Sequence, residues 1–229
     1  MLARRSECVQ VPQSSVLSPL PHSEAEVDYT LGILPLPVNR IECVEAFARV
    51  RNGAIVIVSP GFTGHELAAA EHDDATLYNM EMGYAAPMCL GLALANPAQR
   101  VVALEGDGSM LMALGTFATL ARYAVKNLTI VVFDNGAYLT TGSGSVASAT
   151  ASGADLAAIA RAAGVACSIL VEDLAVFERA IARAMAEEGP WVIVAKVDGS
   201  DRSDPRARGG FPNDVVEQSV LFQLALRRR

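Results

Sequence analysis

Two oxygen-bearing side chains follow two apolar runs of the sequence, at the points where those runs end. Asp107 stands in the turn after the run Val101 to Leu104, and Asn135 closely follows the run Leu128 to Phe133. Because ligands bind at the carboxyl ends of parallel strands, we expect both side chains to approach one point. A hard cation such as Mg2+ binds one or two such side chains and takes its other oxygens from water and phosphates. The pattern therefore predicts a metal site that a phosphorylated ligand completes.

The residues beside Asp107 are suited to hold a phosphate group. Gly106 and Gly108 lack a side chain, so a bulky group can approach their backbone closely. A helix is expected to open at Ser109, and its first turn presents unpaired N–H groups and the positive end of the helix dipole. The turn thus predicts a diphosphate cradle beside the metal, although a Gly-Asp-Gly triplet alone also occurs in ordinary turns.

This arrangement resembles the signature of the thiamine diphosphate enzyme family, in which Gly-Asp-Gly, a spacer and a pair of asparagines follow one another. Here the first asparagine is replaced by Asp134, whereas the second, which binds the metal in the family, is retained as Asn135. The resemblance implies that the backbone carbonyl of Ala137 is a third protein ligand and that Tyr138 belongs to the cofactor-binding segment. It therefore implies thiamine diphosphate and Mg2+ as cofactors.

A second segment, Met80 to Pro87, strengthens the resemblance. It is similar to the Gly-x-Met-Gly-x-x-x-Pro sequence that precedes the diphosphate turn in decarboxylases and carboligases of this family. By that resemblance Met82 props the bent cofactor, and the main chain near Met80 holds the aminopyrimidine ring. The alternative is that Met82 is a core methionine that fills a packing gap.

Composition is consistent with this interpretation. The chain has 229 residues, of which 52% are apolar, and this is enough for one substantial core. Its 18 basic and 25 acidic residues give a net charge of −7, and no basic or aromatic-interleaved run argues for nucleic acid. The four cysteines lack C-x-x-C spacing, and no apolar run is long enough to span a bilayer. Two of the cysteines fall inside apolar segments, where a reduced, buried thiol is expected. We therefore expect a soluble protein in a reducing cytoplasm.

The alternation of apolar runs and helical patterns predicts the fold class. We expect an α/β fold, a doubly wound parallel sheet with helices on both faces. Residues 1–38 are rich in Pro and Ser and are expected to form an irregular extension, and residues 39–229 the diphosphate and Mg2+ domain. After a short helix near Asn39, strands are predicted at 54–58, 76–78, 100–104, 128–133, 165–170 and 191–197, and helices at 63–71, 83–95, 109–123, 155–163, 173–187 and 214–226.

The segment from Thr140 to Ser152 consists of small and apolar residues and directly follows the predicted metal site. Two interpretations stay open: a mobile active-site loop or a flexible connection.

The family also needs a catalytic glutamate, which lies on a separate pyrimidine-binding domain. The residues before Met82 are too few for such a domain, so we expect a partner chain to supply it. Glu45, Glu66, Glu71 and Glu81 are interpreted as solvated charges. In this respect the chain resembles the smaller-domain subunits of two-subunit sulfopyruvate decarboxylases and the related, fused phosphonopyruvate decarboxylases. The resemblance implies a hetero-oligomer, with a homodimer of this domain inside it.

The substrate is expected to be a small 2-oxo acid, which loses carbon dioxide and is released as an aldehyde. Relatives tend to carry Ser-Arg where this chain has Gly64 and His65, which weakens the case for a sulfonate or phosphonate substrate. His65 is a candidate catalytic proton donor, or else a structural residue. A carboligase of the acetolactate type and a non-catalytic thiamine diphosphate-binding regulator are the alternatives, and the lack of cluster-type cysteine spacing argues against a ferredoxin-linked oxidoreductase.

Overall fold

The computed structural model describes residues 38–140, 146–198 and 210–229. The predicted N-terminal extension, residues 1–38, therefore lies outside the described residues except for Val38. Val38 forms a parallel bridge with Val197, and the helix α1 (Arg40–Val50) begins directly after it, with the Asn39 side chain accepting a hydrogen bond from the Ile41 amide. This bridge brings the start of α1 close to the carboxyl end of strand β8 (Trp191–Lys196).

Six parallel strands form the central sheet, in the order β2-β1-β3-β4-β8-β7. The strands of the sheet centre are buried apolar runs, as expected where helices cover both faces. The register pairs Gly106 with Phe133, so the residues after β3 and β4 emerge side by side. The strands are β1 (Ile55–Val58), β2 (Thr76–Leu77), β3 (Val101–Gly106), β4 (Leu128–Asp134), β7 (Cys167–Val171) and β8 (Trp191–Lys196).

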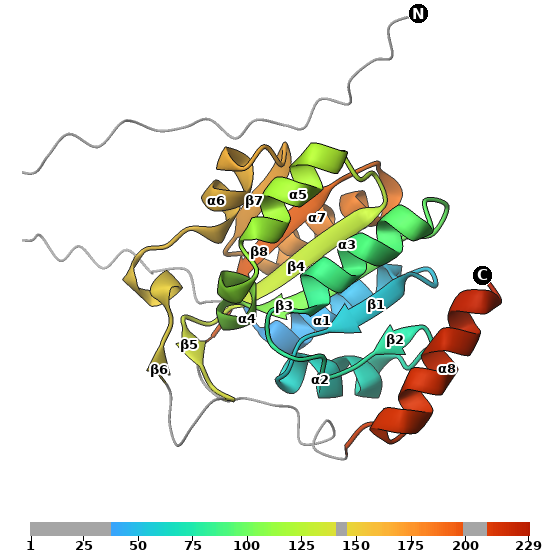
Figure 1. The fold of residues 1–229 in the computed structure, drawn as a ribbon. Helices are drawn as coiled ribbons and strands as arrows, with labels where there is room; N and C mark the ends of the chain where they lie inside the picture. The colour runs from blue at the N-terminus through green and yellow to red at the C-terminus, as the bar shows by residue number, and fades with distance from the viewer. Residues whose placement is uncertain (1–37, 141–145, 199–209) are drawn as a thin grey trace, which may run out of the picture. The chain divides into compact units, whose positions relative to one another are not determined.

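Helices cover both faces of this sheet. Figure 1 shows α3 and α5 in front of the sheet and α1 and α7 behind it. The doubly wound α/β fold predicted from the sequence is confirmed. The remaining helices are α2 (Phe62–Ala70), α3 (Ala85–Ala95), α4 (Asp107–Met112), α5 (Gly115–Tyr123), α6 (Leu156–Ala162), α7 (Leu174–Ala186) and α8 (Val215–Arg227).

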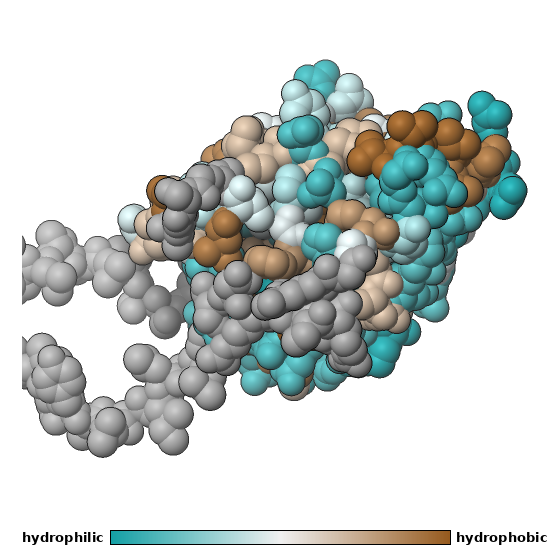
Figure 2. Space-filling view, turned by 90° about the horizontal axis from the view of Figure 1, so that it is seen from below, coloured by the Kyte–Doolittle hydropathy of each residue, from teal (hydrophilic) through white to brown (hydrophobic). Residues whose placement is uncertain are grey.

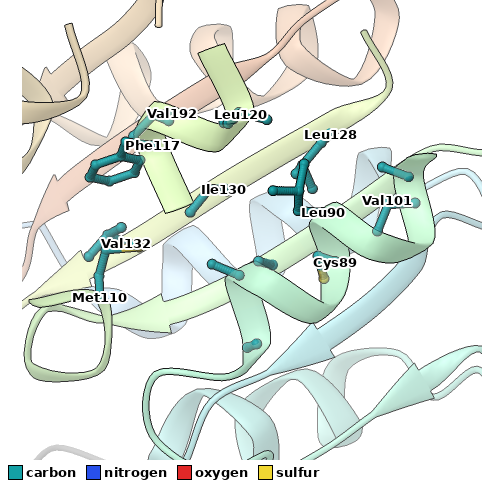
Figure 3. Close-up of a cluster of buried hydrophobic side chains, with 14 of the residues drawn as sticks. Cys89, Leu90, Val101, Met110, Phe117, Leu120, Leu128, Ile130, Val132 and Val192 are labelled. Atoms are coloured by element: carbon teal, nitrogen blue, oxygen red, sulfur yellow. The ribbon is translucent and has the colours of Figure 1, made fainter. Parts of the chain in front are cut away.

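The front core fixes the helix that carries Asp107. Met110 of α4 is fully buried, as are Phe117 of α5 and Ile130 of β4. Figure 3 shows these side chains in one apolar cluster, with Met110 beside Val132. Since Met110 lies less than one helical turn beyond Asp107, its packing anchors the acidic turn to the sheet.

Two local predictions were wrong. The helix predicted over residues 109–123 is two helices, because the backbone leaves the helical conformation at Ala113 before Gly115 starts α5. The second error is an omission: β5 (Ala137–Tyr138) and β6 (Val146–Ala147) form an antiparallel pair, followed by the 3-10 helix η1 (Ala149–Ser152).

The expectation of reduced thiols holds for Cys43 and Cys89 but not for Cys167, which is disulfide-bonded. Cys43 and Cys89 are buried and free, and burial raises the pKa of the Cys43 thiol to about 12. None of the helices in the described ranges is both long and apolar enough to cross a membrane.

One helix presents an exposed apolar face. Val215, Val216 and Val220 of α8 are more than half exposed, and Leu224 follows one turn later. In Figure 2, which views the molecule from below, hydrophobic residues gather at the right, the side on which α8 lies in Figure 1. The helix itself contacts β2, at the edge of the sheet.

Candidate functional site

A cleft opens at the carboxyl ends of β1, β3 and β4. It encloses about 570 Å³, including the part that is open to solvent. Residues that were predicted as metal ligands or as cofactor contacts line this one cleft: Met82, Gly106, Asp107, Gly108, Ser109, Asn135, Ala137 and Tyr138. Parallel strands deliver them to one edge of the sheet, as the sequence analysis expected.

Asp107 is the buried carboxylate of the cleft, with an exposed fraction of only 2%. Its Oδ2 accepts hydrogen bonds from the Ser148 and Thr150 hydroxyls, which η1 and the residue before it supply. Burial raises the pKa of Asp107, and the negative charge of Asp134 raises it further, although the Ser148 hydrogen bond opposes both effects. A cation beside the Asp107 carboxylate would offset the free-energy cost of burying its negative charge.

Asp134, which replaces the usual first asparagine, has its charge balanced by a lysine. The Lys196 Nζ donates to Asp134 Oδ2 at 2.6 Å, and the Thr150 hydroxyl lies 2.6 Å from Asp134 Oδ1. The Asp134 Oδ1 also accepts from the Gly136 amide. Asp134 is therefore a structural anchor that holds η1 and the turn after β4 in place.

The turn after β4 lines the cleft with Asn135 and Ala137. The Asn135 Oδ1 accepts a hydrogen bond from the Ala137 amide at 2.9 Å, which fixes the orientation of the side-chain amide. The Tyr138 ring lies against Gly108: a Cβ atom added there would stand 2.3 Å from Tyr138 Cε1. Only glycine fits at position 108 with the tyrosine in this place.

The upstream Met-Gly segment is tied to the acidic turn. The Ser109 Oγ accepts a hydrogen bond from the Gly83 amide at 2.9 Å, and Gly83 has a φ of 81° that favours glycine. Met82, the residue before Gly83, lines the cleft. Met80 does not line the cleft; its amide donates to the Val58 carbonyl, and its side chain packs against the core.

His65 lies outside the cleft lining. Its ring stacks on Phe211 at a centroid distance of 4.2 Å, and its Nδ1 is buried with no hydrogen-bond partner among the described residues. This placement does not bring His65 together with the other predicted site residues.

Sequence reasoning missed residues that follow β1. Gly61 and Thr63 line the cleft at the start of α2, where Gly61 is the N-cap with a φ of 133° and makes no side-chain cap bond. Among the described residues no side chain caps the first amides of α2, so these amides are suited to bind an anion. The signal was visible as Gly-x-Thr after an apolar run. Arg40, at the start of α1, also lines the cleft.

These groups fit a magnesium diphosphate. A carboxylate, an amide oxygen and a backbone carbonyl are hard oxygen ligands, and Asp107, Asn135 and Ala137 all line the same cleft. The uncapped start of α2 and the turn around Gly108 supply backbone N–H groups on the same edge of the sheet.

The chain is similar to known enzymes over this region. Residues 65–195 match the thiamine pyrophosphate enzyme family, C-terminal TPP binding domain. The beta subunit of sulfopyruvate decarboxylase from Methanothermobacter thermautotrophicus is 39% identical over 146 residues, which are 63% of this chain and 76% of that subunit. The phosphonopyruvate decarboxylase of Streptomyces hygroscopicus is 37% identical over 147 residues, covering 64% of this chain and 36% of that enzyme.

The fold has a match among solved structures. Benzoylformate decarboxylase from Polynucleobacter necessarius aligns with a TM-score of 0.63 at 20% identity, over 73% of this chain and 34% of that one. The chain thus spans about a third of the length of these two longer enzymes. The family match covers more than half of the chain, with the cleft residues Met82 to Tyr138 inside it. The chain therefore belongs to the thiamine pyrophosphate enzyme family and carries its C-terminal TPP binding domain.

Proposed function

We propose that this chain is the diphosphate-binding subunit of a two-component thiamine diphosphate-dependent 2-oxo acid decarboxylase. A partner chain with a pyrimidine-binding domain supplies the catalytic glutamate. The observation that carries the proposal is the cleft in which Asp107, Asn135 and Ala137 lie together within a domain of this family. The relatives named as beta subunits of sulfopyruvate decarboxylase support the two-component arrangement.

In this proposal the metal is Mg2+. The Asp107 carboxylate, the Asn135 side-chain oxygen and the Ala137 carbonyl would hold it, and the diphosphate and water would supply the remaining oxygen ligands. The Ser148 and Thr150 hydroxyls donate hydrogen bonds to Asp107 and fix its orientation, as residues that surround metal ligands commonly do.

The diphosphate lies against the backbone of Gly106, Gly108 and Ser109 and against the start of α2. Met82 supports the bent cofactor from the Met-Gly segment, and the main chain near Met80 contacts the aminopyrimidine. Tyr138 closes the cleft above Gly108. The bound cofactor supplies the electron sink for decarboxylation, and the chain contributes position and exclusion of water.

Calorimetry tests this assignment directly. The chain should bind thiamine diphosphate in the presence of Mg2+ and lose that binding when EDTA removes the metal, because the diphosphate is held mainly through the cation. Binding of equal strength with and without Mg2+ would contradict the metal assignment.

Gly108→Ala is expected to impair the cofactor site while the fold stays intact. The new Cβ would lie 2.3 Å from Tyr138 Cε1, so the tyrosine ring has to move, and the Cβ would also crowd the diphosphate turn. We expect the affinity for thiamine diphosphate to fall by about 10-fold or more. Gly91→Ala in α3, where an added Cβ meets nothing within 4 Å, is the matched control. Wild-type affinity in Gly108→Ala would argue against this cradle.

The partner is expected to cover the face around the cleft. Tyr84 and Met112 are 59% and 64% exposed, and both lie beside Gly83, next to Met82. Large exposed apolar side chains at the rim of a site are typical of a surface that another polypeptide buries. Pairing of two copies of this domain inside the hetero-oligomer is part of the proposal.

A catalytic role of His65 stays a prediction. His65 lies beside Phe211 and outside the cleft lining. It could transfer a proton directly only to a substrate or partner group that reaches it.

A further inference from the structure

Arg40 brings a positive charge to the cleft. Among the described residues that line it, Arg40 is the one with a cationic side chain, and Asp107 is the one with an anionic side chain. Arg40 is nevertheless 92% buried, since its exposed fraction is 8%. A buried arginine is costly unless it is paired, and its position at a ligand-binding cleft therefore needs a reason.

Glu66 of α2 holds the guanidinium in one orientation. The Arg40 Nε donates to Glu66 Oε2 at 2.9 Å, and the Arg40 Nη2 donates to Glu66 Oε1 at 2.7 Å. The Arg40 guanidinium also lies over the Phe62 ring, 5.5 Å from its centroid. This bidentate pair fixes the plane of the guanidinium before any ligand arrives.

The third nitrogen of the group is left for a ligand. Arg40 Nη1 makes no hydrogen bond to a described residue, whereas Nε and Nη2 both donate to Glu66. Because Arg40 lines the cleft and Glu66 occupies its other two nitrogens, Nη1 is the nitrogen that is left for a ligand in the cleft. A fixed N–H donor with a full positive charge is suited to an acid group.

The acid group that it binds is not the one lost as carbon dioxide. An arginine on the departing carboxylate would stabilise the ground state more than the transition state, in which that charge leaves the carboxylate, and would slow the reaction. The diphosphate is already balanced by the metal and the start of α2. We infer that Arg40, oriented by Glu66, binds a second, unreactive acid group on the 2-oxo acid and so determines substrate specificity.

This inference rests on the proposed decarboxylase function and refines its substrate class. It also reverses an expectation from the sequence: loss of the relatives' arginine at position 65 does not remove the cation from the site, because α1 supplies one. The substrates that fit are dianions, such as a 2-oxo acid with a sulfonate, phosphonate or carboxylate on the next carbon.

Paired substrates in the two-subunit holoenzyme test the inference. For Arg40→Gln, KM for sulfopyruvate should rise by about 10- to 100-fold, whereas kcat/KM for pyruvate, which lacks the second acid group, should change little. Calorimetry provides a readout apart from turnover: 3-sulfopropionate should bind the wild-type holoenzyme and not the variant, and propionate should not distinguish them.

Two further variants separate this role from a folding defect. Arg40→Gln leaves Glu66 buried without its partner, so the double variant Arg40→Gln/Glu66→Gln removes both charges and should show the same loss of selectivity. Arg49→Gln, on the same helix and in an exposed pair with Glu178, should leave both substrates unaffected.

The alternative outcomes are distinct. Equal losses for sulfopyruvate and pyruvate would overturn the inference, and so would a weaker affinity for thiamine diphosphate with unchanged selectivity, which would assign Arg40 to the diphosphate. Failure of the proposed function has a different signature, because the wild-type chain would then bind no thiamine diphosphate in Mg2+. In that case binding of 3-sulfopropionate still decides the role of Arg40.

Discussion

Asp107→Ala is expected to weaken thiamine diphosphate binding in Mg2+ by more than about 100-fold. Replacement of a residue that only hydrogen-bonds to a metal ligand already lowers metal affinity or activity by about 10- to 100-fold. Asp107 is the charged oxygen ligand of the proposed site and has an exposed fraction of 2%. Its removal takes away a ligand bond and the negative charge that attracts the cation. Titration calorimetry of both proteins at the same Mg2+ concentration measures the difference.

Asp134→Asn is the matched control for this experiment. It alters a neighbouring carboxylate that contacts Thr150 and Lys196. It also restores the asparagine that the family signature has at this position. We expect it to change cofactor affinity much less than Asp107→Ala does. If Asp107→Ala and Asn135→Ala both kept wild-type affinity with intact thermal unfolding, the metal assignment would be wrong.

The second large effect is expected in the assembly. The purified chain alone should release carbon dioxide from sulfopyruvate or pyruvate at least about 100-fold more slowly than the complex with its pyrimidine-binding subunit. The physical reason is that, in the proposed two-component arrangement, the partner's glutamate activates the cofactor for loss of its C2 proton, and that an uncovered cleft admits water. Coupled detection of carbon dioxide, with each subunit alone and with both together, gives the comparison.

Replacement of the partner's catalytic glutamate by glutamine is the control for assembly. That complex should form and bind the cofactor but stay as slow as the isolated chain. Rapid decarboxylation by the isolated chain would show that the two-component account is wrong.

The strands of the central sheet, and the approach of Asp107 and Asn135 to one cleft, could be predicted because their signals are local. Buried parallel strands are continuous apolar runs, so Leu128 to Phe133 was recognisable, and β4 covers it with one further residue. Asp107 and Asn135 follow such runs, and the geometry of parallel strands brings them to one cleft. Helix α7 (Leu174–Ala186) was predicted within one residue at each end, because Asp173 caps it and its apolar spacing is regular.

The remaining features depend on contacts between distant segments. The β5 and β6 strands have two residues each and carry no periodic pattern, so their pairing was not predictable. The hydroxyls of Ser148 and Thr150 reach Asp107 only because that pairing folds η1 back over the turn. Arg40 was missed for the same reason: it enters the cleft through the packing of α1 against α2 and its bond to Glu66.

A crystal structure of the chain with thiamine diphosphate and Mn2+ in place of Mg2+ tests the central claim most directly. The account predicts one anomalous peak in the cleft, bound by the Asp107 carboxylate, the Asn135 side-chain oxygen and the Ala137 carbonyl at about 2.0–2.3 Å, with diphosphate oxygens as further ligands. A metal held by other residues, or a cofactor bound away from Gly108, would contradict it.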